Sequence, residues 1–266
     1  MATNTLHSSV LGLSLFALLF CNQALPASEN LSPTEGASNT LPSQQEQLND
    51  AAWAIDWELG WDSKYVSQGR NNLDDGGIYW MNTAVEFGNL TAYALVGRGD
   101  NQNYTEWNLG LEFGFNLTEN LETTVGYQRI EVTGDYRCWD NEIFAELAYT
   151  TTPWLVPSVS YVYSTEMAGY FVELSLHSDW ELSEKLSVAP YISQGFDFKY
   201  RTKEHDGRDH LQFGLEASYA FSDSINLTGH ISHSVALRDI ELEAEANGDR
   251  RNQNQSFAGI NINLGF

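Results

Sequence analysis

The sequence is poor in cysteine, in basic residues and in long apolar runs, and each shortage narrows what the protein can be. The 266 residues include 2 cysteines, and no Cys/His group has the spacing of a zinc site. Lys and Arg number 13 against 36 Asp and Glu, which gives a net charge of −23. This balance argues against a nucleic-acid partner, because phosphate binding needs a basic footprint. We expect neither a metal nor another cofactor.

The single continuous apolar run, Val10 to Cys21, is shorter than the ~20 residues that a membrane-spanning helix needs. Small residues follow it, as they follow the core of a secretory signal, although no Lys or Arg precedes it. We therefore expect a signal peptide over 1–27. Residues 28–52 contain almost no large apolar groups and are predicted to be a disordered periplasmic tether. The predicted folded domain is 53–266.

Within this domain, apolar and polar residues alternate with period two. At the end of the chain, one face carries Ala258, Ile260, Ile262, Leu264 and Phe266. The other face carries Phe257, Gly259, Asn261, Asn263 and Gly265. The same split recurs over 105–116 and 210–221. Such alternation, repeated along the chain, is the weak signal expected of membrane β-strands.

The alternation predicts about twelve strands, an even number, as closed antiparallel barrels require. They are expected at 54–66, 77–87, 90–98, 105–116, 121–132, 141–150, 156–164, 169–181, 186–200, 210–221, 225–237 and 255–266. The connections alternate between tight turns and mostly longer polar loops, which is typical of outer-membrane barrels. Aromatic residues gather near both ends of the strands, as in the two interfacial belts that a bilayer selects.

A soluble β-sandwich or ligand-binding barrel is the alternative, with the apolar face turned inward. It would require one core to absorb the Trp, Phe and Leu side chains of a dozen strands, and it leaves the two aromatic belts unexplained. The sequence therefore predicts an all-β protein, a closed antiparallel up-and-down transmembrane β-barrel of the Gram-negative outer membrane. We expect a monomer, because the apolar face has no obvious interruption.

The segment 61–70 reads WDSKYVSQGR, where the first strand runs into its loop. It resembles the opening signature of the TorF-type porin family, which is Ser-Asp-Tyr-Val, one variable residue, then Arg-Gly. The matching residues are Ser63, Tyr65, Val66 and Gly69. Lys64 stands in place of the Asp and Gln68 in place of the Arg, so the match is partial. The resemblance implies a small outer-membrane channel and assigns no catalytic residues.

The polar face of the strands, turned toward the lumen, is rich in carboxylates. The predicted pore-lining residues are Asp56, Glu58, Asp62, Lys64, Glu86, Glu112, Glu122, Glu142, Glu146, Glu173, Asp179, Asp197, Lys199 and Glu216. Twelve strands give a bore between that of filled eight-stranded barrels and that of sixteen-stranded porins. Rings of Asp and Glu favour cations. The hypothesis is a channel for passive diffusion of small solutes that prefers cations, and the sequence does not name the solute.

Two other functions remain open. In the first, the acids pair with Lys64, Lys199 or Arg129 and plug the lumen, giving a closed structural barrel. In the second, loop residues form a hydrolase, since a His beside carboxylates can act as a general base. The loop residues concerned are Asp74, Asp75, Glu204, His205, Asp206, Asp209 and His210. Polar loops collect such residues by default and no Ser has a credible His partner, so we do not expect an enzyme.

Nearly all basic residues lie toward the ends of the strands that carry the longer loops. Arg forks suit phosphate well, so one interpretation is contact with outer-membrane lipid and lipopolysaccharide. The other is that loops simply carry the charges of a membrane protein. Pro190 removes a ladder donor from its strand and predicts a bulge or an unpaired site. In the third strand, Tyr93 and Leu95 compete with Ala92, Ala94 and Val96 for the lipid face.

Overall fold

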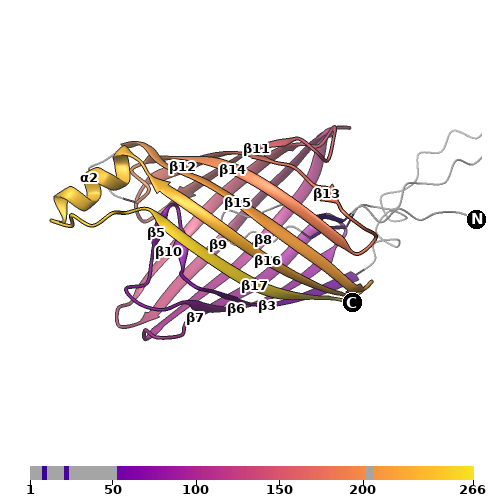
Figure 1. Cartoon of the computed structure of the whole chain (residues 1–266), viewed down its shortest axis with the longest axis horizontal. Helices are drawn as coiled ribbons and strands as arrows, with labels where there is room; N and C mark the ends of the chain where they lie inside the picture. Colours follow the sequence, from indigo (N-terminus) through magenta and orange to yellow (C-terminus); the bar gives the residue numbers. More distant parts are fainter. Residues whose placement is uncertain (1–7, 11–20, 24–52, 202–205) are drawn as a thin grey trace, which may run out of the picture.

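The alternating segments fold as antiparallel strands that close into a barrel (Figure 1). The computed structural model describes residues 8–10, 21–23, 53–201 and 206–266. The wall strands are β3 (Trp53–Asp62), β6 (Ile78–Phe87), β7 (Leu90–Gly99), β8 (Tyr104–Thr118), β9 (Leu121–Gly134), β10 (Cys138–Tyr149), β11 (Val156–Ser164), β12 (Gly169–His177), β14 (Leu186–Phe198), β15 (Asp206–Ser222), β16 (Ile225–Ala236) and β17 (Gln255–Gly265). Among the described residues these twelve strands make up the wall, as the sequence predicts.

The barrel closes because its first and last strands pair with each other. Strand β17 pairs with β3 in an antiparallel register that joins Gly259 to Asp62 and Gly265 to Asp56. Strand β12 pairs with β14, which closes the remaining gap in the order. Every wall strand therefore has two neighbours, and no edge is left with unpaired N–H and C=O groups.

Five short strands and one helix complete the described chain. They are β1 (Ser8–Val10), β2 (Cys21–Gln23), β4 (Val66–Ser67), β5 (Arg70–Asn71), β13 (Trp180–Glu181) and α2 (Arg238–Ala246). Strands β1 and β2 pair antiparallel, as do β4 and β5. The predicted signal peptide (1–27) and tether (28–52) otherwise lie outside the described residues. No helix in the described part of the chain is long and apolar enough to cross a membrane.

The apolar face of the strands points outward. On β8, Leu109 and Leu111 are 50% and 52% exposed, whereas the flanking Asn108 and Glu112 are 4% and 9% exposed. The same order holds on β15, where Phe213 and Leu215 are exposed and Gln212 and Glu216 are buried. A wall of exposed Leu, Phe and Trp needs an apolar surrounding. The soluble alternative, with these side chains in a dry core, is therefore wrong.

The structure shows which side chains of β7 point into the barrel, which its sequence leaves ambiguous. Leu95 is 2% exposed and lies inside the barrel, and Tyr93 packs with an interior cluster. The smaller Ala92, Ala94 and Val96 consequently occupy the outer face. Bulk alone does not decide which side meets lipid, because the register with β6 and β8 fixes the facing of the whole strand.

Pro190 interrupts the wall as predicted. Strand β12 ends at His177 and the ladder to β14 resumes at Trp180 in β13, so the break lies beside Pro190. The backbone N–H of Ser178 donates to the carbonyl oxygen of Pro190 at 3.1 Å. This hydrogen bond uses the proline carbonyl and does not need the N–H that proline lacks. Two residues, Ser178 and Asp179, thus stand out of the ladder where one donor is absent.

The two ends of the barrel differ, and we call them the tight-turn end and the long-loop end. At the tight-turn end the connections are short, such as Gly88-Asn89 between β6 and β7. At the long-loop end, β8, β9 and β10 extend further than predicted, with Cys138 paired to Val132. Among the fully described connections at this end, only the segments 63–77 and 237–254 are long. The others are short because the strands include residues that were predicted to be loops.

Helix α2 is an element that the sequence analysis missed, and it lies between the predicted strands 225–237 and 255–266. Its residues RDIELEAEA are mostly strong helix formers, with Asp239 and Glu241 in the first turn, where carboxylates favour the helix dipole. Ile240 is 4% exposed and packs inward. A helix of 9 residues is marginal alone, so contacts with β15 and β16 stabilise it.

Candidate functional site: the lumen of the barrel

The inward face of the wall carries most of the carboxylates that the sequence assigns to the lumen. By register, the inward positions are Asp56, Glu58 and Asp62 on β3, Glu86 on β6, Glu112 on β8, Glu122 on β9, Glu142 and Glu146 on β10, Glu173 on β12, Asp197 on β14 and Glu216 on β15. Asp179 lies in the break before β13, 3.6 Å from Nε2 of the inward His177. Acids thus come from most of the wall strands.

The acids are unevenly distributed around the wall. Strands β3 to β10 carry Asp56, Glu58, Asp62, Glu86, Glu112, Glu122, Glu142 and Glu146, whereas the other half holds mainly inward Ser, Thr and Asn. Toward the tight-turn end, Glu112 lies close enough to Glu86 and Glu146 for their negative charges to repel one another. Within 53–201 and 206–266, no Lys or Arg side chain projects from the inward face of a wall strand.

The two lysines that the sequence assigns to the lumen lie beyond the ends of their strands. Strand β3 ends at Asp62, and Lys64 donates from Nζ to Oε1 of Gln255 at 3.0 Å. Strand β14 ends at Phe198, and Lys199 is exposed with a φ of +62°. Both strands are shorter than predicted, so the structure places these lysines at the long-loop end, away from the strand wall.

The lumen at the long-loop end is filled by apolar and aromatic side chains, which the sequence analysis did not foresee. One buried cluster combines Leu73 and Tyr65 from the segment 63–77 with wall residues Ile78, Tyr104 and Val132. A second cluster contains Phe144, Val162, Phe171 and Tyr200. The expectation of a uniformly polar interior is therefore wrong at this end, because chain segments from the loops turn inward and need apolar partners.

Glu106 on β8 ties the first of these clusters to the wall. Its carboxylate accepts hydrogen bonds from Tyr65 Oη at 2.9 and 3.0 Å, from Asn108 Nδ2 at 2.9 Å and from Tyr104 Oη. The side chain is 6% exposed. The sequence analysis missed Glu106, although the alternating pattern of this strand places it on the same face as Glu112.

A chain of hydrogen bonds crosses the second cluster. Tyr93 Oη donates to Oε1 of Gln128 at 2.8 Å, and Gln128 Nε2 donates to Oε2 of Glu142 at 2.5 Å. Tyr200 Oη donates to the other carboxylate oxygen of Glu142. Glu142 is only 1% exposed, so its partners take the place of water. This acid is therefore part of a packed network.

A β-bulge brings two neighbouring side chains of β15 into the lumen. The register with β14 shifts between Gln194 and Phe196, so Asp209 and His210 together oppose the single residue Gly195. Asp209 and His210 are 0% and 1% exposed. His210 Nδ1 lies 2.8 Å from Asp209 Oδ1, and its Nε2 lies 3.3 Å from Glu173 Oε2. Strict alternation would have turned Asp209 outward.

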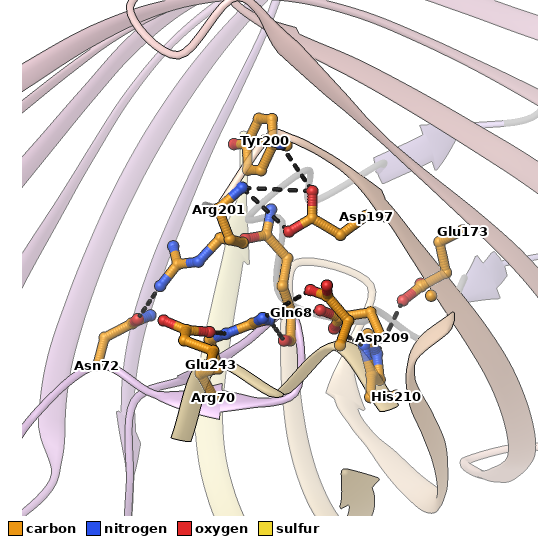
Figure 2. A network of polar contacts seen from close by, with 12 residues as sticks. Gln68, Arg70, Asn72, Glu173, Asp197, Tyr200, Arg201, Asp209, His210 and Glu243 are labelled. Atoms are coloured by element: carbon orange, nitrogen blue, oxygen red, sulfur yellow. Dashed lines mark hydrogen bonds and ion pairs between the residues drawn. The ribbon is translucent and has the colours of Figure 1, made fainter. Parts of the chain in front are cut away.

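Arg70, from the hairpin β4–β5, lies at the centre of a network of charged groups (Figure 2). Its guanidinium contacts Asp209 at 2.6 Å, Asp239 of α2 at 3.2 Å and Glu243 of α2 at 2.6 Å. It also donates to the carbonyl oxygen of Gln68 at 2.9 Å. Burial lowers the pKa of Arg70, but the carboxylates of Asp209 and Glu243 outweigh burial and raise the pKa above its usual value.

Three acids of this network stand close enough together to raise the question of a metal. Asp197, Asp209 and Asp239 each offer an oxygen within 4.8 Å of the others. Arg70 already contacts Asp209 and Asp239, and the backbone N–H groups of Tyr200 and Arg201 donate to Asp197. Protein donors therefore occupy the acids, and we assign no metal to them.

Comparison with solved structures identifies the fold. The KdgM porin superposes with a TM-score of 0.54 at 8% identity, over 80% of this chain and 99% of that chain. The NanC porin gives 0.50 at 10% identity over 79% and 98%, and an outer membrane channel from Pseudomonas putida F1 gives 0.50 at 10% identity over 88% and 100%. The chain has the fold of the outer-membrane porins. No family model and no curated protein matches it.

The loop residues considered for a hydrolase do not gather into one site within this porin fold. Glu204 and His205 lie outside the described residues. Asp209 and His210 are buried in the Arg70 network. Asp75 accepts a hydrogen bond from Asn101 Nδ2 at 2.5 Å, on another loop. The side chains of Asp75, Asp209 and His210 are therefore committed to structural contacts.

Proposed function

We propose that the protein is an outer-membrane channel for the passive diffusion of small solutes and that it prefers cations. One observation carries the proposal: carboxylates line the inward face of the wall, and the described wall strands offer no inward Lys or Arg. A cation in the bore is attracted and an anion is repelled, most strongly beside β3 to β10, where the lumen carboxylates are concentrated. The porin fold, with tight turns toward the periplasm, supports this location and orientation.

The same charge distribution bears on the class of solute. The KdgM porin has been solved in complex with oligogalacturonate, which is a polyanion. An acidic wall opposes such a solute, so this channel is proposed to carry small cationic or neutral molecules instead. The inward Ser, Thr and Asn side chains of β11 to β17 offer neutral hydrogen-bonding groups to hydroxylated solutes.

The reversal potential across planar bilayers in a KCl gradient tests this proposal. We expect a potential of the sign given by K⁺ crossing faster than Cl⁻. A potential of the opposite sign, showing anion preference, contradicts the cation preference but leaves a channel. No conductance at all, from protein that is folded by heat-modified gel migration, contradicts the channel.

A closed structural barrel is the second candidate, and the packed long-loop end favours it. Leu73 and Tyr65 fill the lumen there together with wall side chains, and Tyr200 is buried from a second loop. In the sequence analysis this alternative rested on Lys64, Lys199 or Arg129 pairing with lumen acids. Arg129 instead lies outside the wall, paired with Glu131 at 3.1 Å. The closed-barrel candidate is therefore supported by the inward-folded segments and no longer by ion pairs between these basic residues and lumen acids.

We propose export by residues 1–27, a tether over 28–52, and a monomer surrounded by lipid. Contact with lipopolysaccharide at the long-loop end is supported by the basic residues there, such as the exposed Arg238 and Arg250. Membership of the TorF-type family rests on the partial signature within 61–70, which includes the residues of the inward hairpin.

A further inference from the structure

The segment 63–77 crosses the bore at the long-loop end. On one side, Tyr65 donates to Glu106 of β8 at 2.9 Å. On the other, Arg70 contacts Asp209 of β15 at 2.6 Å. In the closed order of wall strands, β8 and β15 are six steps apart in either direction, so they face each other across the barrel. A segment that touches both strands must span the lumen.

The two sides of this crossing are held in different ways. The Tyr65 side is embedded in the apolar cluster with Leu73 and Ile78, beside the strands from which the segment emerges. The far side depends on the tip of the hairpin. There Gly69 has a φ of +72° and lies so close to His210 that an added Cβ would be 2.6 Å from the Cβ of His210. Arg70 supplies the ion pair to the opposite wall, and Asn72 beside it accepts a hydrogen bond from Arg201 Nη2 at 3.0 Å.

Arg70 also connects the hairpin to α2, which projects beyond the strands at the long-loop end (Figure 1). The side chain of Arg70 is 10% exposed, and those of Asp209 and Asp239 are fully buried. Two buried acids from β15 and α2 thus share one cation. Without that cation they repel each other in a poorly solvated place, which is a costly arrangement. The same contact therefore positions both the hairpin and the helix.

We infer that segment 63–77 is a plug that limits the size of solute admitted to the lumen, and that Arg70 is the residue that positions it. This inference rests on the proposed channel function and names the element that sets its cut-off. Release of the tip leaves the segment attached at the Tyr65 side and clears the bore next to β15. The channel and the closed barrel are then two states of one structure, separated by the ion pairs of Arg70 together with the hydrogen bond that Arg201 Nη2 donates to Asn72 Oδ1 at 3.0 Å.

Two kinds of variant separate this role from a general loss of folding. Arg70→Ala removes the cation, and the double variant Asp239→Asn with Glu243→Gln weakens the contact from α2 while Arg70 and Asp209 stay. Arg251→Ala is the matched control, because the guanidinium of Arg251 is exposed and pairs with Asp249 of the same loop at 2.7 Å. Heat-modified gel migration shows that each variant still forms the barrel.

Single-channel conductance in KCl and exclusion of polyethylene glycols of graded size are measured for wild type, for these three variants and for Arg70→Lys. We expect several-fold higher conductance and passage of larger polymers for Arg70→Ala and for the α2 double variant, with Arg251→Ala like wild type. Arg70→Lys should restore the cut-off only in part, because an ammonium lacks the fork that contacts three carboxylates. Unchanged conductance and cut-off in both release variants overturn the inference.

Trypsin cleavage after Arg70, read by mass spectrometry, tests the plug without any current. The double variant keeps Arg70 but removes two of its three carboxylate partners, so we expect faster cleavage there in vesicles than in wild type, where the side chain is buried. If no protein conducts, the channel proposal fails and cleavage in the double variant alone still supports the plug. Equal protection in both proteins overturns the plug whatever the conductance.

Discussion

Cation preference should fall when two lumen carboxylates, Glu112 and Glu146, are changed to Gln. These residues lie on the inward face of β8 and β10, close to each other and to Glu86. Their change removes two negative charges and almost no volume. The wall should therefore keep its bore while its field weakens, which separates charge from size as the cause of selectivity.

The size of the effect follows from the geometry of the barrel. A strand spacing of ~4.8 Å and a tilt of ~40° give twelve strands a radius of roughly 12 Å. A Glu side chain extends about 4 Å inward, which leaves each carboxylate roughly 8 Å from a cation on the axis. In water that charge contributes about 0.5 kcal/mol, and screening at 0.1 M salt reduces it to roughly 0.2 kcal/mol.

Three such carboxylates favour a cation by roughly 0.7 kcal/mol and disfavour an anion equally, which is about a tenfold preference. One remaining carboxylate gives roughly a twofold preference. In a tenfold KCl gradient, where ideal selectivity gives about 59 mV, the reversal potential should fall from roughly 40 mV to roughly 16 mV. Glu131→Gln is the control, because Glu131 lies on the outer face and pairs with Arg129. Equal reversal potentials for the double variant and wild type refute the reasoning.

Two further predictions concern stability. Gly195→Ala should destabilise the barrel by about 1–3 kcal/mol in urea unfolding, because the new Cβ would lie 2.5 Å from Cε1 of His210, whereas Gly114→Ala meets nothing within 4 Å and should be silent. Equal midpoints for the two variants contradict the close packing at the bulge. Leu111→Arg on the lipid face should lower folding yield in vesicles, at a cost of ~2–4 kcal/mol near the midplane. Folding as efficient as that of Leu111→Ile shows that this face does not meet lipid.

The strands and their facing could be predicted from the sequence because the period-two pattern is local. Leu111 and Glu112 are adjacent in the chain and must project from opposite sides of any strand. Once one face is apolar throughout, its contact with lipid follows from the alternating pattern alone. The break at Pro190 is local in the same sense, since the missing donor belongs to one residue.

The positions of some side chains near the mouth depend on where a strand ends or shifts its register, which pattern alone does not fix. Lys64 and Lys199 follow the inward period of their strands, but both strands stop before them. Asp209 is inward only because the bulge adds one residue to β15. Glu106 differs from these residues, because the alternating pattern of β8 alone places it on the inward face and the sequence analysis overlooked it.

What the sequence determined by itself is a closed, carboxylate-lined barrel with its apolar face outward, because both properties follow from the alternation of neighbouring residues. What only the tertiary structure decided is how the long-loop end is filled. Arg70 meets Asp209, Asp239 and Glu243, which are 139, 169 and 173 residues away along the chain. Such a contact exists because two loops and a helix fold into one space, and no local pattern encodes which distant acids will share one cation.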